Sequence, residues 1–510
     1  MRRQDFHDHR KADNLAAGCF SVLVLITTSA TAIAQTGAFV APPRNISDVT
    51  AILDQQKPDA SKANKARAEA DVSPPASARG ATLGQFYFNR CQARATLGRT
   101  RDAIADCESA VVQGGDYLRD VSRYQATLSN LHRAVGEYRK SIEIEQTTMR
   151  ELGKLPRTKG RFFGINLRIA SNHLNLGELA QAEIVIKRNQ ALLEESKAWP
   201  NVEMFRSSWA YTVERANAQL LQARGKYAEA EAAYRRAQSA QREAISLSAS
   251  WPVKPPPGSL EEGLDFLIMN EGLVKVTQRK LAEGESDVRR ALISRLKAVG
   301  KYHPSTAQAS LALAQVLTEQ SRYSESEKLA RSAVEIYRAL GYPQEVPLHA
   351  NALNRVAMAL FAQGQFDEAN EVFSVLDIAT KDWEEERRAR IQLNYPRIFA
   401  NYYTGKTDLG IKFAQANVER TKKLGEQHFD YAMAQASLGA GLAYGSRFAE
   451  ARQAFLAGVP EMDFHRSGLY WRFNLLVAYL LDHQHWTVDR LLHEPCPAQE
   501  QVESAIRAEK

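Results

Sequence analysis

The sequence predicts an all-α protein, an α-solenoid in which about nine helical hairpins stack side by side into a right-handed superhelix. Three observations lead to this fold class. Residues 303–343 carry apolar and small side chains at three- and four-residue steps, the period of a helix with one buried face. The pattern returns along the chain at intervals of 38 to 54 residues. The sequence lacks the alternating Val, Ile and Thr segments that are typical of strands.

Residues 303–343 give the pattern of one hairpin. Leu313 and Leu317 lie on one face of a predicted first helix, and Tyr323 and Ala330 lie on one face of a predicted second helix. A turn over residues 320–322 joins the two. Small residues let helix backbones approach, and large apolar residues fill the remaining space. Because one hairpin cannot bury both of its faces, copies of it must stack on either side.

Each copy is recognised by the turn residue that precedes the pattern x-[aromatic or Leu]-x-x-[small]. The clearest copies are residues 218–237, 357–373 and 438–455, which repeat Leu, an aromatic residue, Ala and a second aromatic residue at matching positions, with Gly at the turn of the first two. This series resembles the tetratricopeptide repeat, and its long spacing resembles the variety found in kinesin light chains. The resemblance covers residues 83–460. The nine turn residues are Gly98, Gly136, Gly177, Gly225, Arg279, Ser321, Gly364, Gly405 and Ser446.

The resemblance implies that the first helix of each hairpin lines the concave side of the superhelix. Positions two, five, nine and twelve of each repeat then face a groove, where amide and guanidinium groups suit the backbone of an extended peptide. An aromatic stripe in the eighth hairpin includes Phe399, which is also readily interpreted as core. The predicted peptide-binding residues are Arg215, Gln219, Gln222, Asn351, Asn354, Gln392, Tyr395 and Tyr402.

Residues 1–34 are predicted to be an export signal. A basic start precedes an apolar stretch at residues 15–26, and a small-x-small pattern then places cleavage between Ala34 and Gln35. The apolar stretch is short for a transmembrane helix, although an uncleaved anchor is the alternative. We therefore expect an exported protein, periplasmic or secreted, with no stable membrane insertion after cleavage.

Residues 35–82 are predicted to be a leader or linker with one short helix near residues 46–53, and the Lys, Ala and Pro content beyond that helix suggests a tether or a loosely docked arm. The segment ISDVTAILDQQKP is followed by a Pro-Pro break and then by repeats. This arrangement resembles the start of exported proteobacterial proteins that carry tetratricopeptide repeats before a caspase-like domain of the CHAT type. The catalytic half of that group is absent from these residues. This resemblance implies a sensor or docking module for a protease-like partner.

Three local features interrupt the repeats. Residues 251–258 (WPVKPPPG) are a Pro-rich break, interpreted as an inserted loop. The charged run at residues 382–390 is interpreted as a solvated helix face with pairs four residues apart. Pro396 lies inside the expected first helix of the eighth hairpin, where it kinks that helix or marks its start.

The end of the chain departs from the repeat pattern. Residues 461–492 are predicted to form terminal capping helices, and residues 493–510 a disordered tail. The stretch at residues 469–481 is more apolar than an outward-facing cap requires, so a partner or a homo-oligomer contact is expected there.

Two cysteines, Cys91 and Cys107, fall on facing helices of the first hairpin. In an oxidising compartment they could form a disulfide. Two buried free thiols that pack as small hydrophobic groups are the alternative.

Composition and motifs favour binding over catalysis. The net charge of +7 is dispersed over 510 residues, so we expect no nucleic-acid partner, although residues 154–161 are a basic loop beside two aromatic residues. The common hydrolase, metalloprotease and phosphate-loop motifs are absent from the sequence, and no cofactor is expected. The Asp, His and Cys residues within 482–496 match no structural zinc spacing, so no metal site is expected.

The sequence therefore predicts a non-enzymatic scaffold of the cell envelope that binds another protein or an extended peptide on its concave face. The alternative is the regulatory or sensor half of a CHAT-type protease system whose catalytic part is missing or encoded separately.

Overall fold

The structure is a computed structural model that describes residues 41–55, 60–115, 118–155, 158–200 and 202–458. Its contacts divide the chain into two compact units: a larger one over Ala41–Gln392 and a smaller one that includes the described residues 393–458. Every regular element among the described residues is a helix, which confirms the predicted all-α class. The predicted signal segment with Ala34 and Gln35, the helices at 461–492 and the tail at 493–510 lie outside the described residues.

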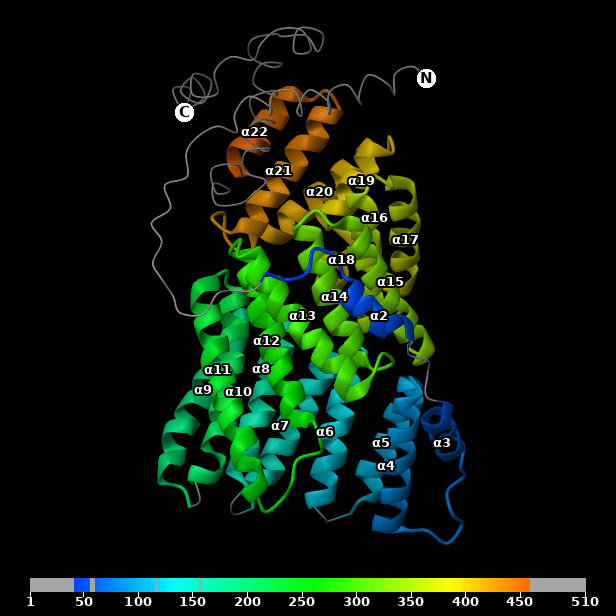
Figure 1. Cartoon of the computed structure of the whole chain (residues 1–510), viewed down its shortest axis with the longest axis vertical. Helices are drawn as coiled ribbons and strands as arrows, with labels where there is room; N and C mark the ends of the chain where they lie inside the picture. Colours follow the sequence, from blue (N-terminus) through cyan, green and yellow to red (C-terminus); the bar gives the residue numbers. More distant parts are fainter. Residues whose placement is uncertain (1–40, 56–59, 116–117, 156–157, 201, 459–510) are drawn as a thin grey trace. The chain divides into compact units, whose positions relative to one another are not determined.

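The helices follow one another as hairpins, each pair joined by a tight turn (Figure 1). In the larger unit the pairs are α4 (Gly80–Thr96) with α5 (Thr100–Gln113), α6 (Leu118–Ala134) with α7 (Tyr138–Gly153), α8 (Phe162–Asn175) with α9 (Leu179–Glu195), α10 (Val202–Ala223) with α11 (Tyr227–Leu247), α12 (Ser259–Thr277) with α13 (Leu281–Val299), α14 (Pro304–Glu319) with α15 (Tyr323–Ala339), and α16 (Pro347–Ala362) with α17 (Phe366–Ala379). In the smaller unit they are α19 (Tyr395–Tyr403) with α20 (Thr407–Lys422) and α21 (Phe429–Tyr444) with α22 (Phe448–Gly458).

All nine predicted turn residues have a left-handed backbone, with φ between 59° and 88°. In every hairpin the next residue donates its N–H to the carbonyl five positions earlier, at 2.8 to 3.0 Å, as Lys226 does to Leu221. This six-to-one bond closes the first helix by a Schellman motif, in which the turn residue must adopt positive φ. Glycine is favoured there because it has no Cβ. Arg279, Ser321 and Ser446 hold the same conformation and are the non-glycine residues with positive φ in the described chain.

The hairpins stack through a regular set of contacts. The second helix of one pair packs on the first helix of the next, as α13 does on α14 and α15 on α16. Successive first helices also contact each other, as α12, α14 and α16 do, so they form the inner layer. Fully buried alanines such as Ala314, Ala330 and Ala357 allow these close approaches, and large buried side chains such as Tyr337 and Phe373 fill the space between helices.

The first hairpin also carries a covalent link. Cys91 on α4 and Cys107 on α5 are joined by a disulfide, with their Cα atoms 5.5 Å apart. Both residues are fully buried, beside Phe88 and Tyr124. The link therefore ties the two helices of this hairpin together at its core.

Pro396 marks the start of a helix. Helix α18 (Glu385–Gln392) ends before it, and α19 begins at Tyr395. The side chain of Asn394 accepts the N–H of Arg397 at 2.9 Å and caps α19. Pro396 fits the first turn because that position needs no amide donor.

The leader contains two helices where the sequence predicted one (Figure 1). The expected helix is α2 (Ser47–Gln55), and α3 (Ala60–Ala70) follows it and packs on α4. Helix α2 packs on α13 with Val49 and Leu53 buried to 0% and 2% exposure. The apolar face of the expected helix thus packs on a surface more than 200 residues away in the sequence. The residues beyond it, interpreted as a tether or a loosely docked arm, include α3, which packs on α4.

Candidate functional site

The inner layer of first helices carries the predicted peptide-binding residues of the larger unit. On α10, Arg215 is half-buried, and its Nη1 donates to the Tyr211 hydroxyl at 2.8 Å. Its guanidinium lies 4.0 Å from the ring centroid of Phe266 on α12. Arg215 therefore bridges two neighbouring first helices.

Two glutamines on α10 also bridge to neighbouring helices. Gln219 accepts from the Ser171 hydroxyl on α8 at 3.1 Å, and Gln222 accepts from the Tyr234 hydroxyl on α11 at 2.9 Å. In both contacts the amide oxygen is engaged. The amide N–H groups are the groups that an incoming peptide carbonyl would need.

The other predicted residues of the larger unit differ in exposure. Asn351 on α16 is exposed and Asn354 is half-buried. Gln392, at the end of α18, is half-buried and donates to the Asp377 carboxylate at 2.9 Å. Asn351 is therefore the most accessible polar side chain of these three.

In the smaller unit the aromatic stripe is mostly core. Tyr402, predicted to face the groove, is only 4% exposed, and its hydroxyl donates to the Ser437 carbonyl at 3.1 Å. This prediction was wrong because Gly441 on α21 leaves room for the ring, and a Cβ there would clash with it. Phe399 is fully buried, as its interpretation as core expects, whereas Tyr395 remains half-buried against the Phe399 ring.

A hollow of about 820 Å³ opens on the inner face of α6, α8 and α10. Its basic lining residues are Arg123, Arg161 and Arg168, and Asp120 is the acid among the described residues that line it. The first two arginines are exposed, and Arg161 also donates to Ser122 at 2.9 Å. Arg168 is held in place by both oxygens of the buried Glu145, at 2.5 and 2.8 Å.

Aromatic side chains form one wall of this hollow, a feature that the sequence analysis did not predict. Trp209 stacks on Phe163 with ring centroids 5.1 Å apart, and both line the hollow. Trp199 and Phe205 pack around Trp209, and Phe205 continues to Trp251, whose Nε1 donates to the Met204 carbonyl. The Pro-rich break thus begins with a buried anchor, and the aromatic cluster gives the hollow a stacking surface.

Three arginines of neighbouring first helices influence one another electrostatically on this inner face. Burial and the neighbouring positive charges of Arg215 and Arg168 lower the pKa of Arg133 below its usual range. These three arginines come from the successive first helices α6, α8 and α10. Like charges held together in a partly dehydrated site favour the binding of an anionic group.

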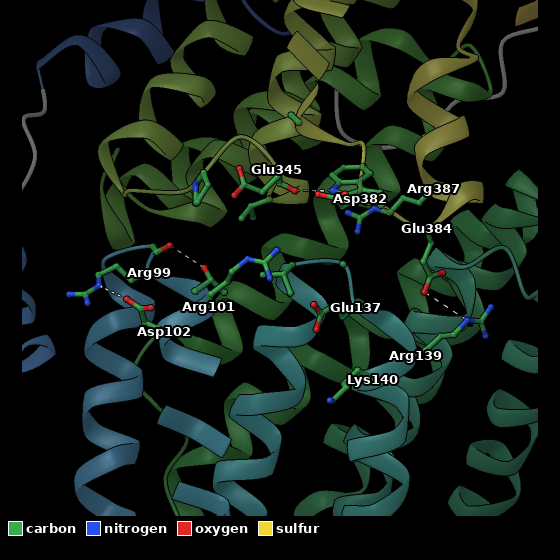
Figure 2. A pocket seen from close by; sticks show the side chains of 18 of the residues that line it. Arg99, Arg101, Asp102, Glu137, Arg139, Lys140, Glu345, Asp382, Glu384 and Arg387 are labelled. Carbon is green, nitrogen blue, oxygen red and sulfur yellow. Dashed lines mark hydrogen bonds and ion pairs between the residues drawn. The ribbon is translucent and has the colours of Figure 1, made fainter. Parts of the chain in front are cut away.

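A second cavity, of about 640 Å³, lies where the turns of the first two hairpins meet residues around α16 and α18 (Figure 2). Arg139 and Glu384 point toward each other across it, 3.8 Å apart. The Arg387 guanidinium lies 4.0 Å from the Trp383 ring centroid and 5.0 Å from that of Tyr138. Acidic and basic side chains line this cavity in nearly equal number, so it has little preference for ligand charge.

The same region corrects the interpretation of the charged run. Arg387 was expected on a solvated helix face, but it is half-buried and its Nη1 lies against the turn at Gly136. Burial lowers the pKa of Arg387. Nearby, Gly98 approaches Gly341 so closely that a Cβ on Gly98 would lie 2.5 Å from the Gly341 carbonyl carbon. Early and late hairpins of the larger unit are therefore in direct contact.

Two further properties concern the described part of the chain. None of its helices combines the length and the apolar character needed to cross a membrane. Within the same ranges, no group of three or more His, Cys, Asp and Glu side chains is arranged to hold a metal ion. The histidines within 482–496 lie outside the described residues.

Comparison with known proteins agrees with the hairpin geometry. A model of the tetratricopeptide repeat matches residues 266–339, which span α13 to α15 and most of α12. None of the curated proteins is significantly similar in sequence. The stacked hairpins are thus tetratricopeptide-like repeats.

Solved structures with the same kind of fold are only distantly similar in sequence. TPR-like repeats of a putative kinesin light chain from Podosopora anserina share 17% identity over 38% of this chain and 92% of that chain, with a TM-score of 0.32. A Rap protein complexed with Competence and Sporulation Factor shares 12% identity over 70% of this chain and 97% of that one, with a TM-score of 0.46. The TPR domain of P58(IPK) shares 15% identity over 79% and 99%, with a TM-score of 0.24.

Proposed function

We propose that this chain is a non-enzymatic scaffold of the cell envelope that binds an extended segment of another protein along its inner face. The hollow on α6, α8 and α10 carries the proposal, because it combines exposed Arg123 and Arg161 with the Trp209 platform. Guanidinium groups pair with carboxylates, and an indole face accepts an apolar or aromatic side chain. The preferred segment is therefore acidic and carries at least one aromatic residue.

A peptide array tests this function on the full mature chain. Fifteen-residue peptides that contain Asp, Glu and one aromatic residue should bind, and matched peptides with Lys in place of the acids should not. Binding should weaken as salt rises, because exposed charge pairs are screened. Equal binding of the acidic and basic sets would contradict the proposal.

Substitutions at the platform test the site itself. Trp209→Ala should weaken the best acidic peptide by about tenfold or more, as loss of a stacked aromatic contact does. Arg123→Ala should weaken it less and reduce the salt dependence, because Arg123 is exposed. Arg188→Ala on the exposed face of α9 removes the same charge away from the hollow and is the matched control. An effect of Arg188→Ala as large as that of Trp209→Ala would place the binding surface elsewhere.

The envelope location rests on the predicted signal of residues 1–34. Mass spectrometry of the protein from its native source should find Gln35 at the N-terminus of the exported form. An N-terminus at residue 1 in the membrane fraction would favour the uncleaved anchor instead.

The alternative function, the regulatory half of a CHAT-type protease system, is supported by the resemblance of residues 46–58 to the start of such proteins. Under this alternative the acidic segment belongs to a separately encoded caspase-like protease. Co-purification of such a protease, with activity that changes when the scaffold is added, would favour it over a general scaffold.

A further inference from the structure

The turns of the first two hairpins meet residues that follow the sixth and seventh hairpins, and we call this meeting place the seam. At one point of the seam the backbone of Gly98 lies against that of Gly341, just after α15. At another, Arg387 lies against the turn at Gly136. The cavity of about 640 Å³ is lined from both sides of the seam (Figure 2). Two glycines bury little side-chain surface, so their contact adds little to the stability of the closed seam.

Helix α2 fixes one end of the leader to the sixth hairpin. Its apolar residues Ile46, Val49 and Leu53 are buried to 4% exposure or less in the core of hairpins five and six. The Ile46 N–H also donates to the Glu325 carboxylate on α15 at 3.0 Å. Because α15 leads directly to Gly341, α2 is attached to the helix that ends at the seam.

Helix α3 fixes the other end of the leader to the first hairpin. Ala70, its last residue, is fully buried, and its carbonyl accepts from Arg94 of α4 at 3.0 Å. The next residue, Asp71, pairs with Arg99 at 2.6 Å. Arg99 follows Gly98 in the chain and lines the seam cavity. The second attachment therefore also reaches the seam, on its opposite side.

A short connection joins the two attached helices (Figure 1). Helix α2 ends at Gln55 and α3 begins at Ala60, so only residues 56–59 lie between them. Five steps along a fully extended chain reach at most about 18 Å. The first hairpin can therefore move away from α15 only by the slack in this connection while both helices stay docked. Wider opening of the seam requires one helix to undock, and undocking α2 would expose its apolar stripe to water.

We infer that α2, α3 and their connection form a strap that keeps the seam closed. Closure holds the two walls of the seam cavity together, so the strap also controls the shape and accessibility of that cavity. Release of α2 would let the first hairpin separate from the sixth. The leader is then a conformational device of the larger unit, and this role does not depend on the function proposed for the inner face.

Lengthening the connection tests the strap in the full chain without altering either docking surface. A 20-residue Gly/Ser insert between residues 56 and 57 should raise amide exchange in residues 97–99 and 340–342 by roughly tenfold. The reason is that a connection about six times longer restrains its ends more weakly, by about the 3/2 power of its length. The same insert between residues 74 and 75, beyond the attachment of α3, is the matched control and should leave this exchange unchanged. Circular dichroism should report the same helix content in both chains.

A second variant undocks α2 directly. Val49→Asp should accelerate exchange in residues 97–99 although they belong to another hairpin, and Ala51→Asp, on the exposed face of α2, should not. Three results would overturn the inference. One is unchanged exchange at residues 97–99 in the chain with the insert at 56–57. Another is equal acceleration by the two inserts. The third is acceleration in Val49→Asp that is confined to α13 and α15, since α2 would then stabilise only its own docking site.

Discussion

At the residue scale, the turn positions connect sequence to structure most directly. All nine predicted positions have left-handed φ, and three of them are not glycine. The turns at Arg279 and Ser321 were predictable from the sequence, although neither residue is glycine, because the residues that follow them keep the repeat pattern. An L side chain in this conformation is less favourable by about 1–2 kcal/mol.

Substituting these turn residues should change stability in opposite directions. Arg279→Gly and Ser321→Gly should each stabilise the protein by up to about 1 kcal/mol, because glycine adopts positive φ without a Cβ clash. Gly225→Ala should destabilise it by about 1–2 kcal/mol, and this change isolates the backbone cost because no other atom lies within 4 Å of the new Cβ. Urea unfolding midpoints measure all three. Stabilisation by Gly225→Ala would contradict the assignment.

A buried histidine should make stability depend on pH. His349 is buried: its Nδ1–H donates to the Tyr342 carbonyl at 2.7 Å, and its Nε2 is buried without a partner. Burial lowers its pKa below the usual value. The unfolded chain therefore binds a proton near pH 6.5 that the folded chain does not, and stability falls as pH drops below that value.

The variant His349→Asn tests this dependence. It keeps a neutral donor for the Tyr342 carbonyl and removes the titrating group. The loss of thermal stability between pH 7 and pH 5 should be smaller than in wild type. His428→Asn, at the N-cap of α21, removes another histidine and is the control. An unchanged pH dependence in His349→Asn would reject the assignment.

At the element scale, local pattern predicted hairpins better than it predicted docking. The apolar stripe of α2 was visible in the sequence, but its receptor on α13 and α15 was not, because periodicity describes one helix and not its distant partner. Tyr402 was misplaced for a related reason. The repeat position suggested a groove, whereas Gly410 and Gly441 on neighbouring helices open space for its ring in the core.

The disulfide of the first hairpin gives an element-scale prediction. Closing the short loop between Cys91 and Cys107 should stabilise the protein by about 3 kcal/mol in the chain-entropy model. Reductant should lower the urea midpoint of the wild type and leave that of Cys91→Ala/Cys107→Ala unchanged. Peptide mapping without reductant should recover the two cysteines in one linked pair. Alkylation of both thiols under those conditions would show that they are free.

At the scale of the larger unit, hairpins distant in sequence touch. The turns at Gly98 and Gly136 meet Gly341 and Arg387, and the Arg387 side chain lies between two aromatic rings. Repeat counting indicated how many hairpins there are. It could not indicate this contact, which depends on the accumulated rotation from one hairpin to the next.

Loss of the Arg387 contact should loosen the turns it covers. In Arg387→Ala, amide hydrogen exchange should accelerate in residues 135–140 and in α18, while the core of α14 stays protected. Arg388→Ala removes an adjacent arginine that donates to the Lys381 carbonyl instead, and it should leave residues 135–140 unchanged. Equal exchange in the two variants would show that Arg387 does not hold the contact.

The close approach of Gly98 and Gly341 constrains how this chain can evolve. Repeat arrays commonly lengthen or shorten by duplicating or deleting a whole module. Duplication or deletion of a hairpin between these two glycines would move one of them relative to the other. Neither backbone would then have its present contact. The contact between Gly98 and Gly341 therefore fixes the number of hairpins between them. Hairpins outside residues 98–341 are free of this constraint.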